Sequence, residues 1–233
     1  AMGSDAGPYL DWMKKKEINT DYIKVIKDKY TAQAYIATDK SSNQITIFHP
    51  GAMQYANEIK IPENDSITLG IISPDGRDGM IEHTQQLIDM KVPYVFDPGQ
   101  GMPMFNKEEL VFFTDNASWV VMNDYEFKMY NEITGYTPAD VIQNNKTLVI
   151  TNGDQGSNIF TENKKLNIAT PKVDNPKDPT GCGDAYRAGI MYGIMNNMPL
   201  EKIGELSSAL GALKAKSYGT QNHIIGTEIK KLL

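Results

Sequence analysis

The chain has 233 residues and 40% of them are hydrophobic, so it can bury a substantial core as one large α/β domain or as two small domains. Its formal net charge of −6 argues against a nucleic-acid surface, because phosphate backbones attract clusters of Lys and Arg. The single cysteine excludes an internal disulfide, no apolar run is long enough to span a bilayer, and no signal-peptide pattern is found. We therefore expect a soluble cytoplasmic protein without nucleic-acid or membrane partners.

The N-terminal third contains three segments in which apolar and polar residues alternate, at positions 22–26, 33–38 and 44–48. Alternation with a period of two is typical of strands with one covered face. Residues 39–43 are turn-prone and are predicted to join the second and third segments. The pattern predicts a small antiparallel β element.

From about residue 66 onward, short apolar runs alternate with segments of helical pattern. Strands are predicted at 66–72, 92–96, 119–122 and 147–150, and helices at 79–90, at 107–114 and along the apolar repeat of Ile203, Leu206, Leu210 and Leu213. Such alternation is typical of a mostly parallel sheet covered by helices. Polar loops follow three of the strands, at 97–100, 123–126 and 151–157, and in such sheets ligands bind beside these loops.

The segment 178–184, Asp-Pro-Thr-Gly-Cys-Gly-Asp, has the most readable chemistry of the chain, because it opens an apolar helical run. Unpaired N–H groups at a helix start attract anions such as phosphoryl groups, and glycines allow close approach. Asp184 does not suit anion binding, so we interpret it as the acceptor of a proton from an attacking hydroxyl. The alternative is an ordinary Gly-rich loop with an aspartate in the first helical turn.

This segment resembles the D-[TP]-T-G-A-G-D signature of the ribokinase-like (pfkB) carbohydrate kinases, from which only Cys182 departs. The resemblance implies an ATP-dependent kinase that phosphorylates a primary hydroxyl, with a three-layer αβα fold, a mostly parallel central sheet and a small antiparallel β lid. It assigns an anion hole for the γ-phosphate to Gly181, Cys182 and Gly183, and the role of catalytic base to Asp184.

Asn123 and Glu126 resemble the N-x-x-E motif of the same family, whose residues help to place Mg²⁺, largely through water. The same spacing also fits a helix N-cap with its capping-box partner. The two interpretations are compatible, and both stay open at this point.

Thr151, Gly153 and Gly156 resemble the family's T-x-G-x-x-G nucleotide loop. The alternative is a tight hairpin turn between Val149 and Ile159, which two glycines also favour. The order of the three motifs along the chain is more specific than any one of them, and it favours the kinase interpretation. We therefore expect the ATP phosphates over residues 151–156.

The segment 209–222 resembles the family's late helix and its glycine-containing exit. The resemblance places adenine near residues 219–222, which makes Gly219 and Asn222, together with Thr180, nucleotide-binding candidates. It also implies a monovalent cation such as K⁺ between Asp178 and the turn after the helix. The alternative for Gly219 is a plain helix C-cap.

Residues 3–7 resemble the family's G-x-D-x-x-G region, although an origin in cloning stays open for residues 1–4. Family members carry a substrate-binding strand and a Gly-Gly segment before that region, and neither pattern occurs in this sequence. We therefore expect one N-terminally truncated ribokinase-like domain over residues 1–233, with lid strands roughly within residues 20–55.

The segments 31–34, 38–39, 43–48 and 50–53 look most like those of adenosine kinase-type members, so the 5′-hydroxyl of adenosine is the first choice of acceptor. Ribose or another sugar is the second choice. A hypothesis of another class is a nucleotide-binding remnant without catalysis. A homodimer is also considered, although no sequence pattern tests it, and a dinucleotide-binding dehydrogenase is set aside because no G-x-G-x-x-G follows an early strand.

Overall fold

The computed structural model describes residues 1–38, 44–63, 66–230 and 232. Contacts divide the chain into two compact units. The first unit contains Ala1–Asn64 and Ile72–Lys91, and the second contains Asp65–Ile71 and Val92–Leu233. The prediction of a single domain is not tested by this division and stays a prediction.

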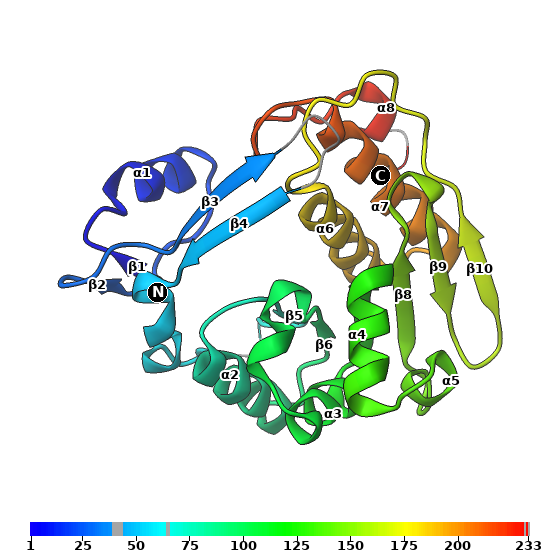
Figure 1. Cartoon of the computed structure of the whole chain (residues 1–233), viewed down its shortest axis with the longest axis horizontal. Helices are drawn as coiled ribbons and strands as arrows, with labels where there is room; N and C mark the ends of the chain where they lie inside the picture. Colours follow the sequence, from blue (N-terminus) through cyan, green and yellow to red (C-terminus); the bar gives the residue numbers. More distant parts are fainter. Residues whose placement is uncertain (39–43, 64–65, 231, 233) are drawn as a thin grey trace. The chain divides into compact units, whose positions relative to one another are not determined.

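The second unit is built on a six-stranded sheet, in the order β10-β9-β8-β7-β6-β5 (Figure 1), and only Ile72 at the end of β5 is counted with the first unit. Its strands are β5 (Gly70–Ile72), β6 (Tyr94–Phe96), β7 (Trp119–Asn123), β8 (Thr147–Thr151), β9 (Ser157–Phe160) and β10 (Lys165–Ile168). β6, β7 and β8 run parallel, whereas β9 and β10 each run antiparallel to their neighbours. The four predicted strands are confirmed as β5 to β8, while β9 and β10 were not predicted as strands.

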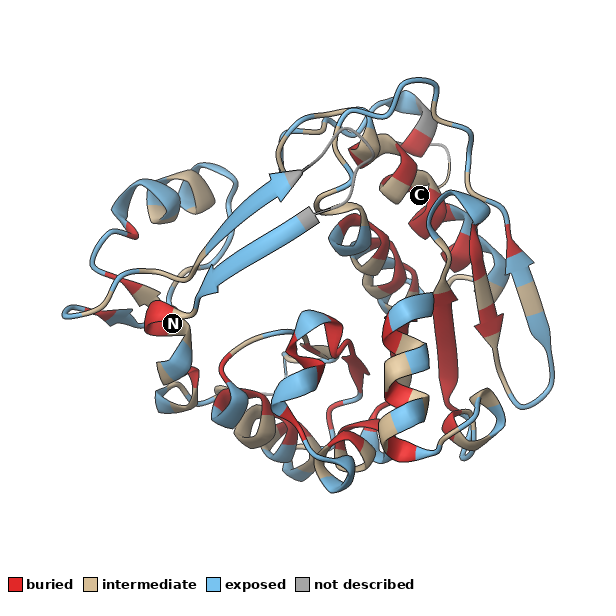
Figure 2. Cartoon of the chain, viewed as in Figure 1, coloured by how far each residue is buried: buried red, intermediate tan, exposed pale blue. Residues whose placement is uncertain are grey.

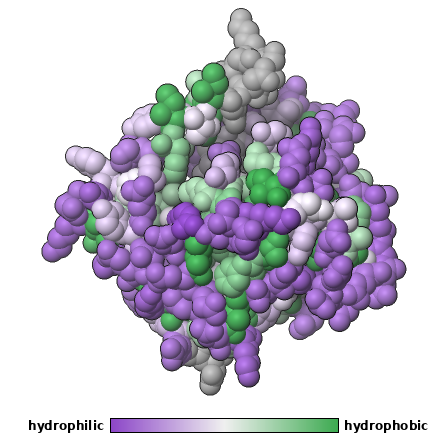
Figure 3. Space-filling model, turned by 60° about the horizontal axis from the view of Figure 1, so that its bottom comes forward, coloured by the Kyte–Doolittle hydropathy of each residue, from purple (hydrophilic) through white to green (hydrophobic). Residues whose placement is uncertain are grey.

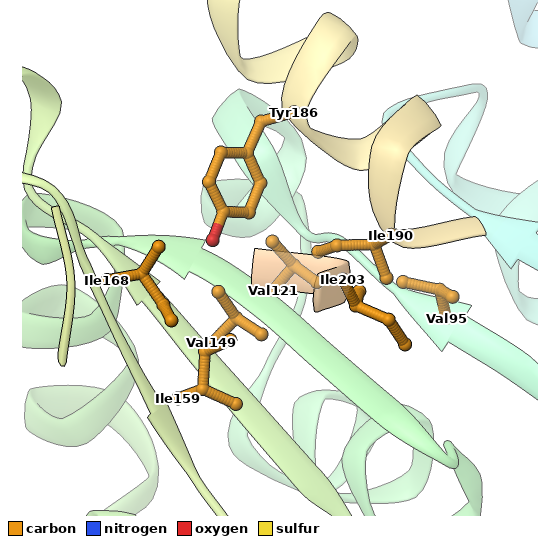
Figure 4. Packing of buried hydrophobic residues seen from close by; sticks show 8 residues of the cluster. All are labelled: Val95, Val121, Val149, Ile159, Ile168, Tyr186, Ile190 and Ile203. Carbon is orange, nitrogen blue, oxygen red and sulfur yellow. The ribbon is translucent and has the colours of Figure 1, made fainter. Parts of the chain in front are cut away.

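Helices cover both faces of this sheet, which gives the three expected layers. On one face, α6 (Cys182–Met195) and α7 (Leu200–Ala215) pack against strand residues in a cluster of Val95, Val121, Val149, Ile159, Ile168, Tyr186, Ile190 and Ile203 (Figure 4). The next residue along β6, Phe96, points to the other face, where its ring stacks on Phe113 of α3 (Lys107–Asn116). Also in this unit are α4 (Asp124–Thr134), the short α5 (Pro138–Val141) and α8 (Thr227–Lys230), and the 3₁₀ turns η2 (Gly99–Met104) and η3 (Gly153–Gln155).

The first unit combines short strands with two helices. It contains β1 (Met2–Gly3), α1 (Gly7–Lys15), β2 (Val25–Ile26), β3 (Gln33–Thr38), β4 (Gln44–His49), the 3₁₀ segment η1 (Gly51–Glu58) and α2 (Arg77–Asp89). β3 and β4 pair antiparallel, which confirms that part of the predicted element. The predicted turn at 39–43 lies outside the described residues.

The prediction that residues 22–26 join the antiparallel element is wrong. Only β2 forms there, and it pairs in parallel with β1. Side-chain hydrogen bonds hold the start of the chain in this unit, because the Gly3 N–H donates to the Thr31 hydroxyl at 2.9 Å and Asp5 accepts hydrogen bonds from the Thr31 N–H and hydroxyl. Residues 2–5 are therefore an integral part of the first unit.

Burial differs strongly between the six-stranded sheet and the β3–β4 pair (Figure 2). β6 to β8 are almost fully buried, whereas β3 and β4 expose apolar side chains such as Ile45 and Ile47. Hydrophilic side chains dominate the face shown in Figure 3, with hydrophobic patches among them. None of the helices in the described ranges has the length and apolar character needed to cross a membrane.

Candidate active site

The start of α6 lacks a side-chain cap. Its N-cap residue, Gly181, has a φ of 88° in the left-handed region that favours glycine. Cys182 donates its N–H to the Pro179 carbonyl at 3.1 Å, but the N–H groups of Gly181, Gly183 and Asp184 have no acceptor among the described residues. Free donors at the positive end of a helix dipole form an anion site. The Cys182 N–H is the one predicted anion-hole donor that is already occupied.

The thiol of Cys182 is half-buried beside these donors, and burial raises its pKa. Asp184, in the first turn of α6, exposes 80% of its side chain, so a substrate hydroxyl can reach its carboxylate. The guanidinium of Arg187 lies one turn further along, with Nη1 at 3.6 Å from Asp184 Oδ1. A carboxylate that is open to substrate and held by a cation on one side suits a general base.

Arg187 is anchored by a buried partner. Asp97 follows β6 and exposes only 2% of its side chain; its Oδ1 accepts a hydrogen bond from Arg187 Nη2 at 2.7 Å, and its Oδ2 contacts Arg187 Nε. The Nη2–Oδ1 contact is a charge-assisted hydrogen bond, which is stronger than a neutral one, and the Nε–Oδ2 contact adds to the ion pair. A Cβ at residue 183 would lie 2.5 Å from Arg187 Nη1, so Gly183 leaves the room that the guanidinium occupies.

Neither Asp97 nor Arg187 was assigned a role from the sequence. A signal was present, because Arg187 is the only charged residue between Asp184 and the end of the apolar run at 194. A lone charge within an apolar helix is expected to have a buried partner.

Asn123 and Glu126 form a capping box at the start of α4. Asn123 Oδ1 accepts from the Glu126 N–H at 2.7 Å, and Glu126 Oε2 accepts from the Asn123 N–H at 2.8 Å. The capping interpretation is therefore confirmed. Glu126 is buried, and this burial raises its pKa, partly offset by the hydrogen bond from Asn123 and the nearby charge of Arg187.

The side-chain oxygen atoms of Asn123 and Glu126 fit Mg²⁺ only through a bridging water, not as direct ligands. Among the described residues no group of three or more His, Cys, Asp or Glu side chains could hold a metal ion. Mg²⁺ usually keeps several waters and binds through one or two carboxylates together with substrate phosphates. A water-mediated role for Glu126 fits this preference, whereas Asn123 Oδ1 is already used as the helix cap.

Residues 151–157 form the hairpin between β8 and β9, so the hairpin interpretation is confirmed, with Val149 opposite Ile159. Gly156 has a φ of 95°, and a Cβ there would lie 2.1 Å from the Ile168 carbonyl oxygen. Gly153 also has a positive φ, of 58°. Thr151 lies opposite Asn123 in the parallel pairing of β7 and β8, which places two of the predicted motifs at one edge of the sheet.

Residues 178–181, called the signature loop below, are hydrogen-bonded to the chain segment that follows α7. The carboxylate of Asp178 accepts hydrogen bonds from the N–H groups of Thr180 and Gly219, both at 2.9 Å. The hydrogen bond from Thr180 is the main cause that lowers the pKa of Asp178. The N–H of Lys177 donates to the Ala215 carbonyl at 2.8 Å, at the last residue of α7.

Gly219 is not the C-cap of α7, so that alternative is wrong: the helix ends at Ala215 and Lys216 is the C-cap. Instead, Gly219 has a φ of 74° within a turn in which Asn222 Nδ2 donates to the Tyr218 carbonyl at 3.0 Å. Thr220 in this turn approaches Gly181, because a Cβ at 181 would lie 3.2 Å from its Cα. Thr180, Gly181 and Gly219 are thus brought together, and their binding of a nucleotide stays a prediction.

A mainly apolar cavity of about 300 Å³ lies beside the last part of α7. It is lined by Pro171, Lys172, Val173, Ala209, Ala212, Leu213, Lys216, Ile224, Gly226, Thr227, Ile229 and Leu232. One of these residues, Ile224, lies two positions after the predicted adenine contacts at 219–222.

Comparisons with known proteins identify the family to which the chain belongs. The model of the pfkB family of carbohydrate kinases matches residues 1–226. The chain belongs to this family of phosphotransferases, which act on an alcohol group of a sugar or nucleoside.

Several relatives are nucleoside kinases. The nucleoside kinase of Methanocaldococcus jannaschii is 30% identical over 93% of this chain and 71% of the relative. The structure of Burkholderia thailandensis nucleoside kinase in complex with inosine has a TM-score of 0.92 and 39% identity, and the match covers 95% of this chain and 74% of that chain. The structure of the same kinase in complex with ADP-inosine has a TM-score of 0.91 and 38% identity, and the match covers 99% of this chain and 73% of that chain.

Proposed function

We propose that the protein is a nucleoside kinase that transfers the γ-phosphate of ATP to the 5′-hydroxyl of a purine nucleoside such as adenosine. The observation that carries the proposal is the uncapped start of α6, where free N–H groups adjoin the exposed Asp184 carboxylate. An anion site next to a reachable base is what phosphoryl transfer to a hydroxyl requires. The similarity to nucleoside kinases, one of them bound to inosine, supports a nucleoside as the acceptor.

In the proposed reaction, the nucleoside oxygen attacks the γ-phosphorus while the bond to the ADP oxygen breaks. Asp184 takes the proton of the attacking hydroxyl, and the free N–H groups of Gly181, Gly183 and Asp184 stabilise the charge on the transferring group. Arg187 lies beside the Asp184 carboxylate and is itself fixed by Asp97. Preorganised donors of this kind need no rearrangement during the reaction.

The nucleotide is proposed to lie along the same edge of the sheet. The phosphates would extend over the hairpin of Thr151, Gly153 and Gly156, and the base would enter the apolar cavity beside α7. Apolar pockets with a few polar groups are typical of sites for planar ligands. Thr180, Gly219 and Asn222 would border the nucleotide between these two places.

Mg²⁺ would be held by the phosphates and, through water, by Glu126, and when bound it neutralises negative charge on the nucleotide. The role of the chain is to keep Glu126 in place. The capping box with Asn123 does this, because it fixes the carboxylate at the end of β7.

The proposal is tested by incubating the protein with ATP and Mg²⁺ and one candidate acceptor at a time, with detection of both ADP and the phosphorylated product. The panel contains adenosine, inosine, cytidine, ribose and fructose, and 5′-deoxyadenosine is the matched control because it lacks the reacting hydroxyl. We expect 5′-phosphates of purine nucleosides and no product from 5′-deoxyadenosine. Phosphorylation of ribose alone would replace the nucleoside with a sugar, and ATP binding without any product would indicate a non-catalytic remnant.

A further inference from the structure

The side chain of Lys214 occupies the position where the sequence resemblance implied a monovalent cation. Lys214 lies in the last turn of α7 and is fully buried, with 0% of its side chain exposed. Its ammonium donates to the carbonyl oxygen of Asp178 at 2.7 Å and to that of Ser217 at 3.2 Å, and it lies 4.0 Å from Asp178 Oδ2.

These three oxygen atoms are the kind of ligand set that a monovalent metal ion also takes. Two are backbone carbonyls, and the third belongs to a carboxylate whose low pKa keeps it charged. A buried ammonium is costly unless such partners compensate its lost hydration. Because Lys214 fills this oxygen-lined place with its own positive charge, an exchangeable cation does not fit the residues present.

We infer that Lys214 is a built-in cation that replaces the exchangeable monovalent cation and thereby makes the protein independent of K⁺. Its ammonium joins the two chain segments that shape the anion site, the signature loop at Asp178 and the turn at Ser217. The same turn continues to Thr220, which lies against Gly181 at the start of α6. Lys214 is therefore a positioning residue for the free N–H groups of that helix, and it does not touch the reacting atoms.

Thermal unfolding tests this inference without any need for activity. The melting temperature of the protein is measured in KCl, in NH₄Cl and in choline chloride at equal ionic strength, because choline is too large for the space of an ammonium group. We expect the unaltered protein to melt at the same temperature in the three salts. Lys214→Ala should melt lower in choline chloride and regain part of the loss in KCl or NH₄Cl, because the small ion enters the vacated space.

Lys202→Ala is the matched control, because Lys202 lies on the same helix but is exposed and pairs with Glu205. Its melting temperature should show no dependence on the cation. Lys214→Met keeps most of the side-chain volume but leaves no room for an ion, so it should be destabilised without rescue by salt. If K⁺ stabilises the unaltered protein, or if Lys214→Ala responds to the cations no more than Lys202→Ala does, the inference is wrong.

A second measurement rests on the proposed function and uses the rate of phosphoryl transfer. The unaltered protein should have the same rate in KCl and in choline chloride. Lys214→Ala should lose about tenfold in kcat in choline chloride, the equivalent of one charge-assisted hydrogen bond, and should recover in NH₄Cl. Absence of phosphoryl transfer in every salt would count against the proposed function alone, since the melting experiment does not depend on turnover.

Discussion

The two helices α4 and α6 begin in opposite ways, although both lie in the same unit. The start of α4 is capped, because the side chains of Asn123 and Glu126 each accept a hydrogen bond from the other residue's backbone N–H. α6 begins at a glycine in the left-handed conformation and has no side-chain cap. α3 and α5 also have capping boxes, from Asn106 with Glu109 and from Thr137 with Asp140.

Under the proposed function, the same backbone chemistry serves stability at the start of α4 and ligand binding at the start of α6. A capped start contributes to helix stability at its own end, and its donors are then occupied. An uncapped start gives up that contribution, of the order of 1 kcal/mol, and keeps its donors for an external anion. α4 would therefore position the surroundings of the site, whereas α6 would contact the transferring group.

The largest effect should come from Asp184→Asn, which removes the proposed base from α6. We expect kcat for phosphoryl transfer to fall by about 10³-fold, within the range found for general bases, while ATP affinity changes little. The measurements are a coupled ADP assay and a nucleotide titration. Glu108→Gln is the matched control, because Glu108 is an exposed carboxylate in the first turn of the capped helix α3. A near-normal rate of Asp184→Asn would show that Asp184 is not the base.

Arg187→Met should have the next largest effect, on stability. It leaves the buried Asp97 without its cation, and breaking a buried pair from one side costs about 3 kcal/mol or more. Urea unfolding of the variant measures the loss in the free energy of unfolding. Arg187→Lys keeps the charge but cannot contact Asp97 through two nitrogen atoms. Its free energy of unfolding should therefore lie between those of the unaltered protein and of Arg187→Met. If Arg187→Met unfolds at the same urea concentration as the unaltered protein, the pair is not a structural anchor.

Gly181→Ala tests the geometry of the uncapped start. The left-handed conformation costs an alanine about 1–2 kcal/mol, and the added Cβ would also meet Thr220. Gly135→Ala is a close control, since Gly135 caps the end of α4 with a φ of 80° and has nothing within 4 Å of the added Cβ. Both variants should lose stability in thermal unfolding, but only Gly181→Ala should also lose turnover. Equal turnover in the two variants would show that the approach to Thr220 has no role at the site.

The smallest effect is expected from Glu126→Gln, and it depends on pH. Burial raises the pKa of Glu126, so the folded state favours the protonated acid. The protonated acid contributes to the stability of the folded state fully below the unfolded pKa of about 4.3, and this contribution is lost as the pH rises through the folded pKa. Gln resembles the protonated acid and can keep the capping box. The variant should therefore melt about 2–4 °C higher than the unaltered protein at pH 8, and the difference should close toward pH 4.

Calorimetry at several pH values measures this difference, and the Mg²⁺ concentration for half-maximal turnover measures the other proposed role of Glu126. That concentration should rise about tenfold or more in Glu126→Gln, as is found when outer partners of a metal are changed. If neither the melting temperature nor the Mg²⁺ response changes, the carboxylate acts only as the cap of α4.

Much of the fold could be predicted because the buried strands β6 to β8 are continuous apolar runs that end in polar turns. β9 and β10 carry a weaker pattern, with polar residues such as Asn158 and Asn167 between the apolar ones, and they were missed. β2 was misassigned because alternation in the sequence cannot show that its partner is the two-residue strand at Met2.

The residues of the candidate site also fall into those that could be recognised from the sequence and those that could not. Residues whose role follows from the local backbone, such as Gly181 and the pair of Asn123 and Glu126, could be recognised from short motifs. Asp97 and Arg187 lie 90 positions apart, and their pairing depends on how β6 and α6 come together in the fold. Lys214 reads as an ordinary basic residue in a last helical turn until its burial is known.

The half-buried thiol of Cys182 has a practical consequence, because it is the only one in the chain and stands at the start of α6. Any thiol-directed fluorophore or spin label would therefore report from this one place, without the need to remove other cysteines. Burial favours the unreactive protonated form at neutral pH, so labelling would be slow. The departure of residue 182 from the family signature thus supplies a single chemical label at the start of α6, where the proposed nucleotide would bind.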